Sequence, residues 1–200
     1  MRTRLFAVLA ALVVTLSACG VNSIPTAEEE AKARWADVQA SYQRRANLIP
    51  NLVATVRGAA ASEERILTGV TQARADATRI TVTPDQLTDP AAMQRFAEAQ
   101  SRLSAAIIPL QRLQEAYPNL QSQQNFSTLM QQLEGTENRI NIAVRDYNSA
   151  VQNYNTTIRT FPAVIGAKVI YGSEPMATFQ ATTPNADVAP TVDFGDGNAQ

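Results

Sequence analysis

Three observations predict an all-α protein, an antiparallel up-down-up bundle of three long helices with a short fourth helix and coiled-coil-like packing. Apolar residues recur at alternating spacings of three and four over most of the chain, as on the buried face of a packed helix. Loop-forming residues are confined to a few short segments between these runs. The 200 residues, 45% of them hydrophobic, are enough for one domain with a sizeable core.

Residues 1–18 combine a basic start, an apolar run and a small-residue end, the three parts of a secretory signal. The stretch Leu16-Ser17-Ala18-Cys19 resembles the processing site of a bacterial lipoprotein, and Cys19 is the only cysteine of the chain. The apolar run is shorter than the roughly 20 residues that span a bilayer. We expect cleavage before Cys19, a lipid on its thiol and a tether over 19–25. This places the protein on the extracytoplasmic side of the membrane, on the outer membrane where the host is Gram-negative.

The charge and composition exclude several classes of function. The formal charge of −1 becomes −3 when Arg2 and Arg4 leave with the signal. A protein without a basic excess binds phosphate backbones poorly, so no nucleic-acid partner is expected. The chain has no histidine, which excludes hydrolase triads with a histidine base and Glu-x-x-His di-iron sites. No spacing of metal ligands appears, and we expect no metal, no cofactor and no catalytic residues.

The bundle domain is expected over 26–181, and its first helix over 27–77. Thr26 and Glu29 have the form of a capping box at the start of this helix. The spacing of three and four then continues without a change of phase along the whole segment. Pro50 lies inside the segment and removes a helical N–H, so a kink is expected there rather than an end.

The later elements follow from the same reasoning. Asp89 and Pro90 have the form of an N-cap and a first helical residue, and Pro109 is expected to interrupt the helix that they begin. A connecting loop is expected at 80–89, a second helix at 90–117 and a third helix at 119–161. Residues 163–179 are expected to form a short helix or to lie extended on the bundle, and residues 182–200 to form a disordered tail.

Polar residues occur where the apolar stripes are expected to be buried: Arg45 and Glu63 on the first stripe, and Glu137 and Asn148 beside the third. Such groups are costly at a helix interface unless they are paired. One interpretation is that they fix the register of the helices, as a buried polar residue does in a coiled coil, with Arg45 paired to Glu137. The other is a pocket that binds a ligand, lined by Arg45, Asn47, Asn51, Glu137, Arg145 and Asn148.

An aromatic and amide pattern marks the third helix. Tyr147-Asn148 and Tyr154-Asn155 repeat at a spacing of seven, which puts the tyrosines on one face and the asparagines beside them. An aromatic stripe is typical of a core, with each hydroxyl reaching a partner at the edge. We therefore expect both tyrosines to be buried.

Several motifs occur together after the signal: Glu63, YQRRANLIPNLV at 42–53, YPNL at 117–120, TENRI at 136–140, AVRDYN at 143–148, VQNYN at 151–155 and FP at 161–162. In combination they resemble the LemA family of bacterial envelope proteins, over most of the chain after the signal. The resemblance implies an antiparallel helical bundle tethered to a membrane at its N-terminus, without an established biochemical role.

These observations predict a lipid-anchored, non-enzymatic scaffold or adaptor that holds an unknown protein partner at the bacterial envelope. The alternative is a small-ligand-binding protein or hydrolase that uses the polar pocket, and a structural spacer is a third possibility. A cavity lined by Arg45, Glu137 and Arg145 would favour the ligand-binding protein, whereas a filled interface would favour the scaffold. An exposed apolar patch would count against the spacer.

Overall fold

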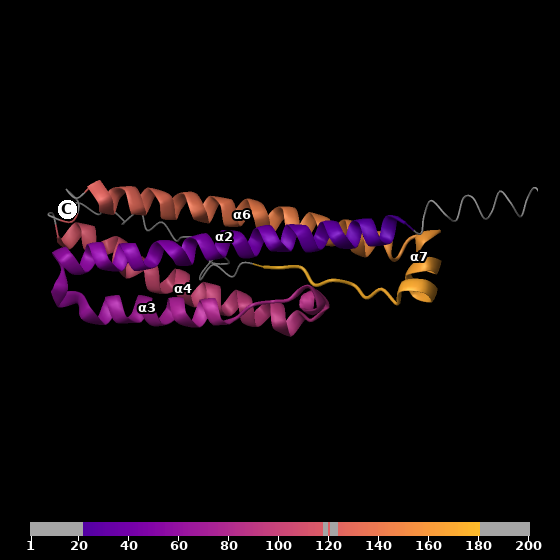
Figure 1. Ribbon diagram of the computed structural model, residues 1–200, viewed down its shortest axis with the longest axis horizontal. Helices are drawn as coiled ribbons and strands as arrows, with labels where there is room; N and C mark the ends of the chain where they lie inside the picture. The colour runs from indigo at the N-terminus through magenta and orange to yellow at the C-terminus, as the bar shows by residue number, and fades with distance from the viewer. Residues whose placement is uncertain (1–21, 118–119, 121–123, 181–200) are drawn as a thin grey trace, which may run out of the picture.

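The computed structural model describes residues 22–117, 120 and 124–180, and these form the predicted all-α antiparallel bundle (Figure 1). Four helices in the described residues are 16 residues or longer, and they run alternately up and down: α2 (Ser23–Ala59), α3 (Glu64–Arg79), α4 (Pro90–Ala116) and α6 (Gln124–Thr157). The shorter pieces are the 3₁₀ turns η1 (Ala61–Glu63) and η2 (Pro84–Thr88), the helical turn α7 (Ala163–Gly166) and the π-helical turn η3 (Ala167–Tyr171).

The predicted single helix over 27–77 is wrong, because the chain reverses between α2 and α3. Ala60 leaves the helical conformation, with φ −139° and ψ 58°, and its N–H donates to the Val56 carbonyl at 2.8 Å. The turn η1 follows, and α3 returns beside α2 (Figure 1). The apolar spacing keeps its phase across the reversal because both helices bury their stripes in one core, which contains Val56, Leu67 and Val70. The bundle therefore has four main helices in up-down-up-down order instead of the predicted three.

Pro50 lies inside α2 without ending it, and a neighbouring helix supplies the donor that proline lacks. A proline at this position leaves the Ala46 carbonyl without its helical N–H. Arg74 of α3 donates from Nε to the Ala46 carbonyl at 2.8 Å. One side chain thus completes the hydrogen bonding of α2 and holds α3 against it.

Replacing Arg74 by leucine is expected to lower the free energy of unfolding by about 1–2 kcal/mol, because a half-buried carbonyl loses a charged donor. In a Pro50→Ala background the N–H of residue 50 is available to that carbonyl, so the same replacement is expected to cost roughly half as much. Urea denaturation of the four chains measures both values. Arg79→Leu, at an exposed position of α3, is the control. Equal costs in the two backgrounds would contradict this role for Arg74.

The start of α2 differs from the prediction. The helix begins at Ser23, and the expected capping box of Thr26 and Glu29 is not formed. Instead, Thr26 lies in the first turn, where its hydroxyl donates to the Asn22 carbonyl at 2.9 Å. The acidic residues that follow form ion pairs along the helix surface with Lys32 and Arg34.

The later elements lie close to their predicted positions. Asp89 caps α4, since its carboxylate accepts from the Ala91 N–H at 2.9 Å. The helix α4 continues through Pro109, so the expected interruption is wrong. The predicted helix over 119–161 is α6, which ends at Thr157. The predicted short helix is present as α7 and η3.

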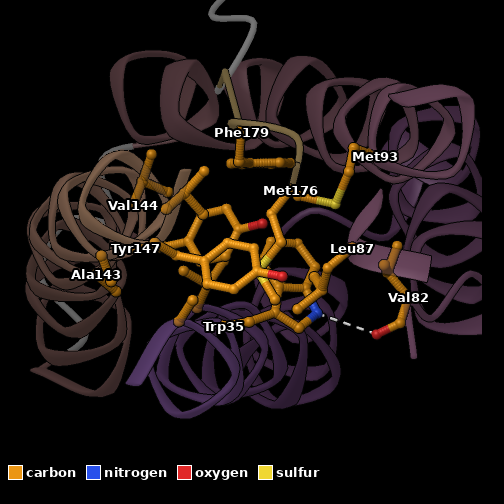
Figure 2. Close-up of a cluster of buried hydrophobic side chains, with 14 of the residues drawn as sticks. Trp35, Val82, Leu87, Met93, Ala143, Val144, Tyr147, Met176 and Phe179 are labelled. Carbon is orange, nitrogen blue, oxygen red and sulfur yellow. Dashed lines mark hydrogen bonds between the residues drawn. The ribbon is translucent and has the colours of Figure 1, made fainter. Parts of the chain in front are cut away.

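Buried apolar side chains form two clusters, one toward each end of the bundle. The proximal core, nearer the start of α2, is centred on Trp35, which lies beside Tyr147 and Phe179 (Figure 2). The centroid of the Trp35 ring lies 5.4 Å from that of Phe96, 5.1 Å from that of Tyr147 and 5.6 Å from that of Phe179. Trp35 also donates from Nε1 to the Val82 carbonyl at 3.0 Å. The distal core is formed by the end of α2 with α3, α4 and the start of α6.

The C-terminal segment (172–180) is extended and runs back along the bundle (Figure 1). Met176 and Phe179 point into the proximal core (Figure 2), and the Ala177 N–H donates to the Leu87 carbonyl of η2 at 2.8 Å. Both alternatives for this part of the chain therefore occur, a short helix followed by an extended segment. The predicted signal peptide, Cys19 and the predicted tail lie outside the described residues. No helix within the described ranges is long and apolar enough to cross a bilayer.

Candidate functional site

One charged residue is buried in the part of the chain that the structure describes, and it lies between the two cores. Arg45 is 1% exposed, and it is flanked along α2 by Tyr42 of the proximal core and Ile49 of the distal core. The corresponding gap in α4 contains Gln100, with Ser104 one turn further along that helix, and the gap in α6 contains Glu137. These four residues, Arg45, Gln100, Ser104 and Glu137, are called the polar layer.

The guanidinium of Arg45, on α2, is bound by residues of two other helices, α4 and α6. Its Nη1 donates to the Ser104 hydroxyl at 2.7 Å and to the Glu137 carboxylate at 2.6 Å. Its Nη2 donates to the side-chain oxygen of Gln100 at 2.9 Å and to the Gln100 carbonyl at 3.2 Å. Only Nε has no hydrogen-bond partner within the described residues. The predicted pairing of Arg45 with Glu137 is confirmed, as a charge-assisted bond with one partner fully buried.

Gln100 connects the polar layer to α3, the main helix that contributes no side chain to the layer. Its side-chain nitrogen donates to the Ala77 carbonyl at 3.3 Å. Ala77 lies in the last turn of α3, where carbonyls have no partner within the helix. The Ser104 hydroxyl in turn donates to the Gln100 carbonyl at 3.1 Å. A shift of any one helix by a turn would break these contacts, so the layer fixes the register of all four.

The aromatic neighbour of Arg45 has a strongly perturbed proton affinity. The Tyr42 ring lies 5.0 Å from the guanidinium carbon, a cation–π contact. Burial raises the pKa of Tyr42 to about 12. Its hydroxyl therefore stays protonated at neutral pH and is unsuited to act as a base there. The pKa of Tyr147 is also raised by burial.

Three other predicted site residues lie away from the polar layer. Asn47 and Asn51 are exposed on α2, where Asn47 accepts from Gln43 on the same helix at 3.0 Å. Glu63 lies in η1 at the distal end, where it accepts from the Tyr117 hydroxyl at 2.9 Å. The predicted pocket is thus not formed as a unit, and Glu63 is not on a helix stripe.

Asn148 has a role that the sequence did not reveal: it binds the main chain of the C-terminal segment. Its amide nitrogen donates to the Phe179 carbonyl at 2.8 Å, and its oxygen accepts from the Phe179 N–H at 2.8 Å. Asn155, seven residues later, makes the same two bonds to Met176, both at 2.9 Å. Two asparagines at heptad spacing therefore clamp an extended peptide against α6.

Both tyrosines of the same repeat are buried, as predicted. The Tyr147 hydroxyl donates to the Ala177 carbonyl at 2.8 Å, so it reaches a partner at the edge of the core. The repeat Tyr-Asn is the sequence signal for this clamp. The position of the extended segment, which the clamp requires, follows only from the structure.

An open depression of about 840 Å³ lies on the outer side of the clamp, between α6 and the C-terminal segment. It is lined by neutral polar groups and two arginines, among them Arg145, Asn148, Gln152, Asn155 and Arg159. None of the described residues that line it carries a carboxylate, an imidazole or a thiol. The depression can attract an anion, and its described lining offers no group suited to act as a general base at neutral pH.

The polar layer and the clamp both lie within a region matched by a family model. The LemA family model matches residues 34–194. The chain belongs to the LemA family. A comparison with curated proteins gives no match. The match includes the polar layer, the clamp and part of the predicted tail, and it begins after Cys19.

The structure shows which of the predicted site residues this LemA family chain brings together. Of the predicted site residues, the structure brings only Arg45 and Glu137 into contact, and it adds Gln100 and Ser104. Gln100 stands four residues after Phe96 and three before Leu103, both of which are buried. Its place on an apolar stripe is therefore a sequence signal for a buried polar side chain. Ser104 carries no such signal.

Proposed function

We propose that this LemA family protein is a lipid-anchored, non-enzymatic scaffold or adaptor of the bacterial envelope. The observation that supports it most is the filled polar layer. The buried guanidinium of Arg45 is bound by oxygens of the chain itself, so its charge is balanced without a ligand. A bundle whose buried charge is balanced internally is suited to present its outer surface to a partner.

The N-terminal sequence supports anchoring at one end of this bundle. Cys19 precedes Ser23, the first residue of α2, by four residues, a reach of at most about 14 Å. The 37 residues of α2 extend about 55 Å from there to the distal end. A diacylated Cys19 would hold the proximal end at the extracytoplasmic bilayer surface, on the outer membrane of a Gram-negative host, and leave the distal end for an envelope partner.

A second candidate function is binding of a small anionic ligand in the depression beside the clamp. Arg145 and Arg159 on its lining favour this alternative. Hydrolysis has less support, because the chain has no histidine and the depression has no carboxylate. Titration of the protein with inorganic phosphate, with Arg145→Ala as the comparison, distinguishes a ligand site from a surface feature.

The anchor is tested by Cys19→Ser in the native host. The variant is expected to remain unprocessed, to fail to incorporate a fatty-acid probe and to leave the membrane fraction after the wash that retains the parent. Asn22→Ala, three residues later, is the control and should label normally. A Cys19→Ser protein that is still processed, labelled and membrane-bound would contradict the proposal. Density-gradient fractionation of the parent identifies the membrane that holds it.

A further inference from the structure

Large exposed apolar side chains collect at one end of the bundle. Five of them lie within eleven residues and are between 44% and 80% exposed: Phe161, Ile165, Val169, Ile170 and Tyr171. Elsewhere in the described residues, Ile108 and Ile142 are the large hydrophobic residues of comparable exposure, at 43% and 41%. The five residues are called the apolar cap. Such a concentration marks an interaction surface.

The local sequence turns these side chains outward. In α7 and η3 the small residues Ala163, Gly166 and Ala167 face the bundle and are buried. The large residues Ile165 and Val169, four apart, occupy the opposite face. This is the reverse of a surface helix of a soluble protein, which buries its large apolar residues and exposes its polar ones. The outward face therefore has a use other than folding.

The apolar cap lies at the end of the bundle where α2 begins (Figure 1). Ala163 and Ala167 pack in the same core as Ile24 and Ala27 of the first turns of α2. Tyr171 also shares a surface depression with Glu28 and Lys32. The cap is thus beside the first turns of α2, which begins four residues after Cys19 in the sequence.

We propose that the apolar cap inserts into the interfacial region of a lipid bilayer, as a second contact beside the lipid on Cys19. The proposal rests on the proposed anchoring, which brings this end of the bundle to the membrane. Lys168 and Arg159 are exposed beside the cap, where their charged ends can reach lipid phosphates. Tyr171 has the amphipathic ring favoured at the headgroup level. Two contacts, instead of the lipid alone, would set the orientation of the bundle on the membrane.

The cap is tested with residues 20–200, which carry no lipid and contain every residue of the two cores, from Ile24 to Phe179. Flotation with phosphatidylcholine–phosphatidylglycerol vesicles measures binding. The parent should float with the vesicles, and a triple change of Ile165, Val169 and Ile170 to serine should weaken partitioning at least about tenfold. The three side chains are exposed, so circular dichroism should show an unchanged helical fold and melting midpoint.

The control is Ile108→Ser with Ile142→Ser, which removes the large exposed apolar groups found elsewhere in the described residues and should float like the parent. A parent that does not float, or a triple variant that floats equally well, would overturn the proposal. Sedimentation equilibrium of the parent and of the triple variant measures their oligomeric states and tests the competing explanation. A parent that is a dimer and a triple variant that is a monomer would show that the cap binds a second copy of the chain instead. The unlipidated chain makes this result independent of the Cys19 labelling experiment, so failure of the anchor and failure of the cap are distinguishable.

Discussion

Phe179→Ala is expected to lower the free energy of unfolding by about 3–5 kcal/mol, the usual cost of removing a fully buried aromatic side chain. Phe179 is 1% exposed, and its ring packs edge-on against Trp35 and Phe96 in the proximal core (Figure 2). Its main chain is held by Asn148. Urea denaturation followed by the fluorescence of Trp35, the only tryptophan, measures the change.

The adjacent Thr178 is exposed, so Thr178→Ala is the control and should change stability by less than about 0.5 kcal/mol. Similar small effects of both replacements would mean that the C-terminal segment does not dock on the bundle in solution. The prediction therefore separates a structural C-terminal segment from a loosely attached one.

Glu137→Leu is expected to lower the free energy of unfolding by about 2–3 kcal/mol, because it leaves the buried charge of Arg45 without a counter-charge. Breaking a fully buried pair costs ~3–5 kcal/mol, and an exposed pair is worth less than about 1 kcal/mol. Glu137 is 46% exposed, so water already screens part of the interaction, and an intermediate value follows. Glu134→Leu, at an exposed position of α6, is the control. Thermal and urea unfolding provide the comparison.

Combining Glu137→Leu with Arg45→Met should recover part of this loss, since the stranded charge is removed as well. Recovery should be incomplete, because the side-chain oxygen of Gln100 then loses its donor. Arg44→Met, at the exposed neighbouring position, controls for the loss of an arginine. Additive effects of the two replacements would show that Arg45 and Glu137 do not interact.

The helical class was predictable because most of the chain carries one periodic signal, and the reversal after α2 was not. An apolar spacing shows which residues are buried, but not the direction in which the chain passes the core. Val56 and Leu67 bury in the same core on antiparallel helices, so the spacing continues across the turn. The weak signal of the turn is the run of small residues at 58–62.

The effect of the prolines was predictable only in part, because groups distant in the sequence can compensate for the missing N–H: a continuing helix at Pro50 was predicted correctly, and an interruption at Pro109 was not. Pro50 fits within α2 since Arg74 supplies a donor, and Arg74 comes near only when α3 folds back. Pro109 likewise lies within a continuous α4. Sequence identifies the missing N–H, but tertiary structure determines whether it bends or ends a helix.

The candidate site was predictable in part for a related reason. A charge on an apolar stripe requires a partner, and this condition alone leads from Arg45 to Glu137. Asn148 lies beside an apolar stripe, and its partner is the main chain of Phe179. A main-chain partner leaves no signal in the sequence, because every residue has the same peptide group. Asn47 and Asn51 stand in the same motif as Arg45 but on exposed faces of α2, because successive positions of a helix point in different directions.

The central claim is that the polar layer has a structural role and that the outer surface of the bundle binds the partner. Its most direct test replaces the layer by apolar residues, with Arg45→Met, Gln100→Leu and Glu137→Leu together, in the native membrane. Formaldehyde crosslinking with mass spectrometry then compares the proteins attached to the variant and to the parent. We predict a folded, membrane-bound variant with the same crosslinked partners, since such replacements are often neutral for stability. A folded, membrane-bound variant that loses its partners would contradict the claim and make the polar layer a binding site.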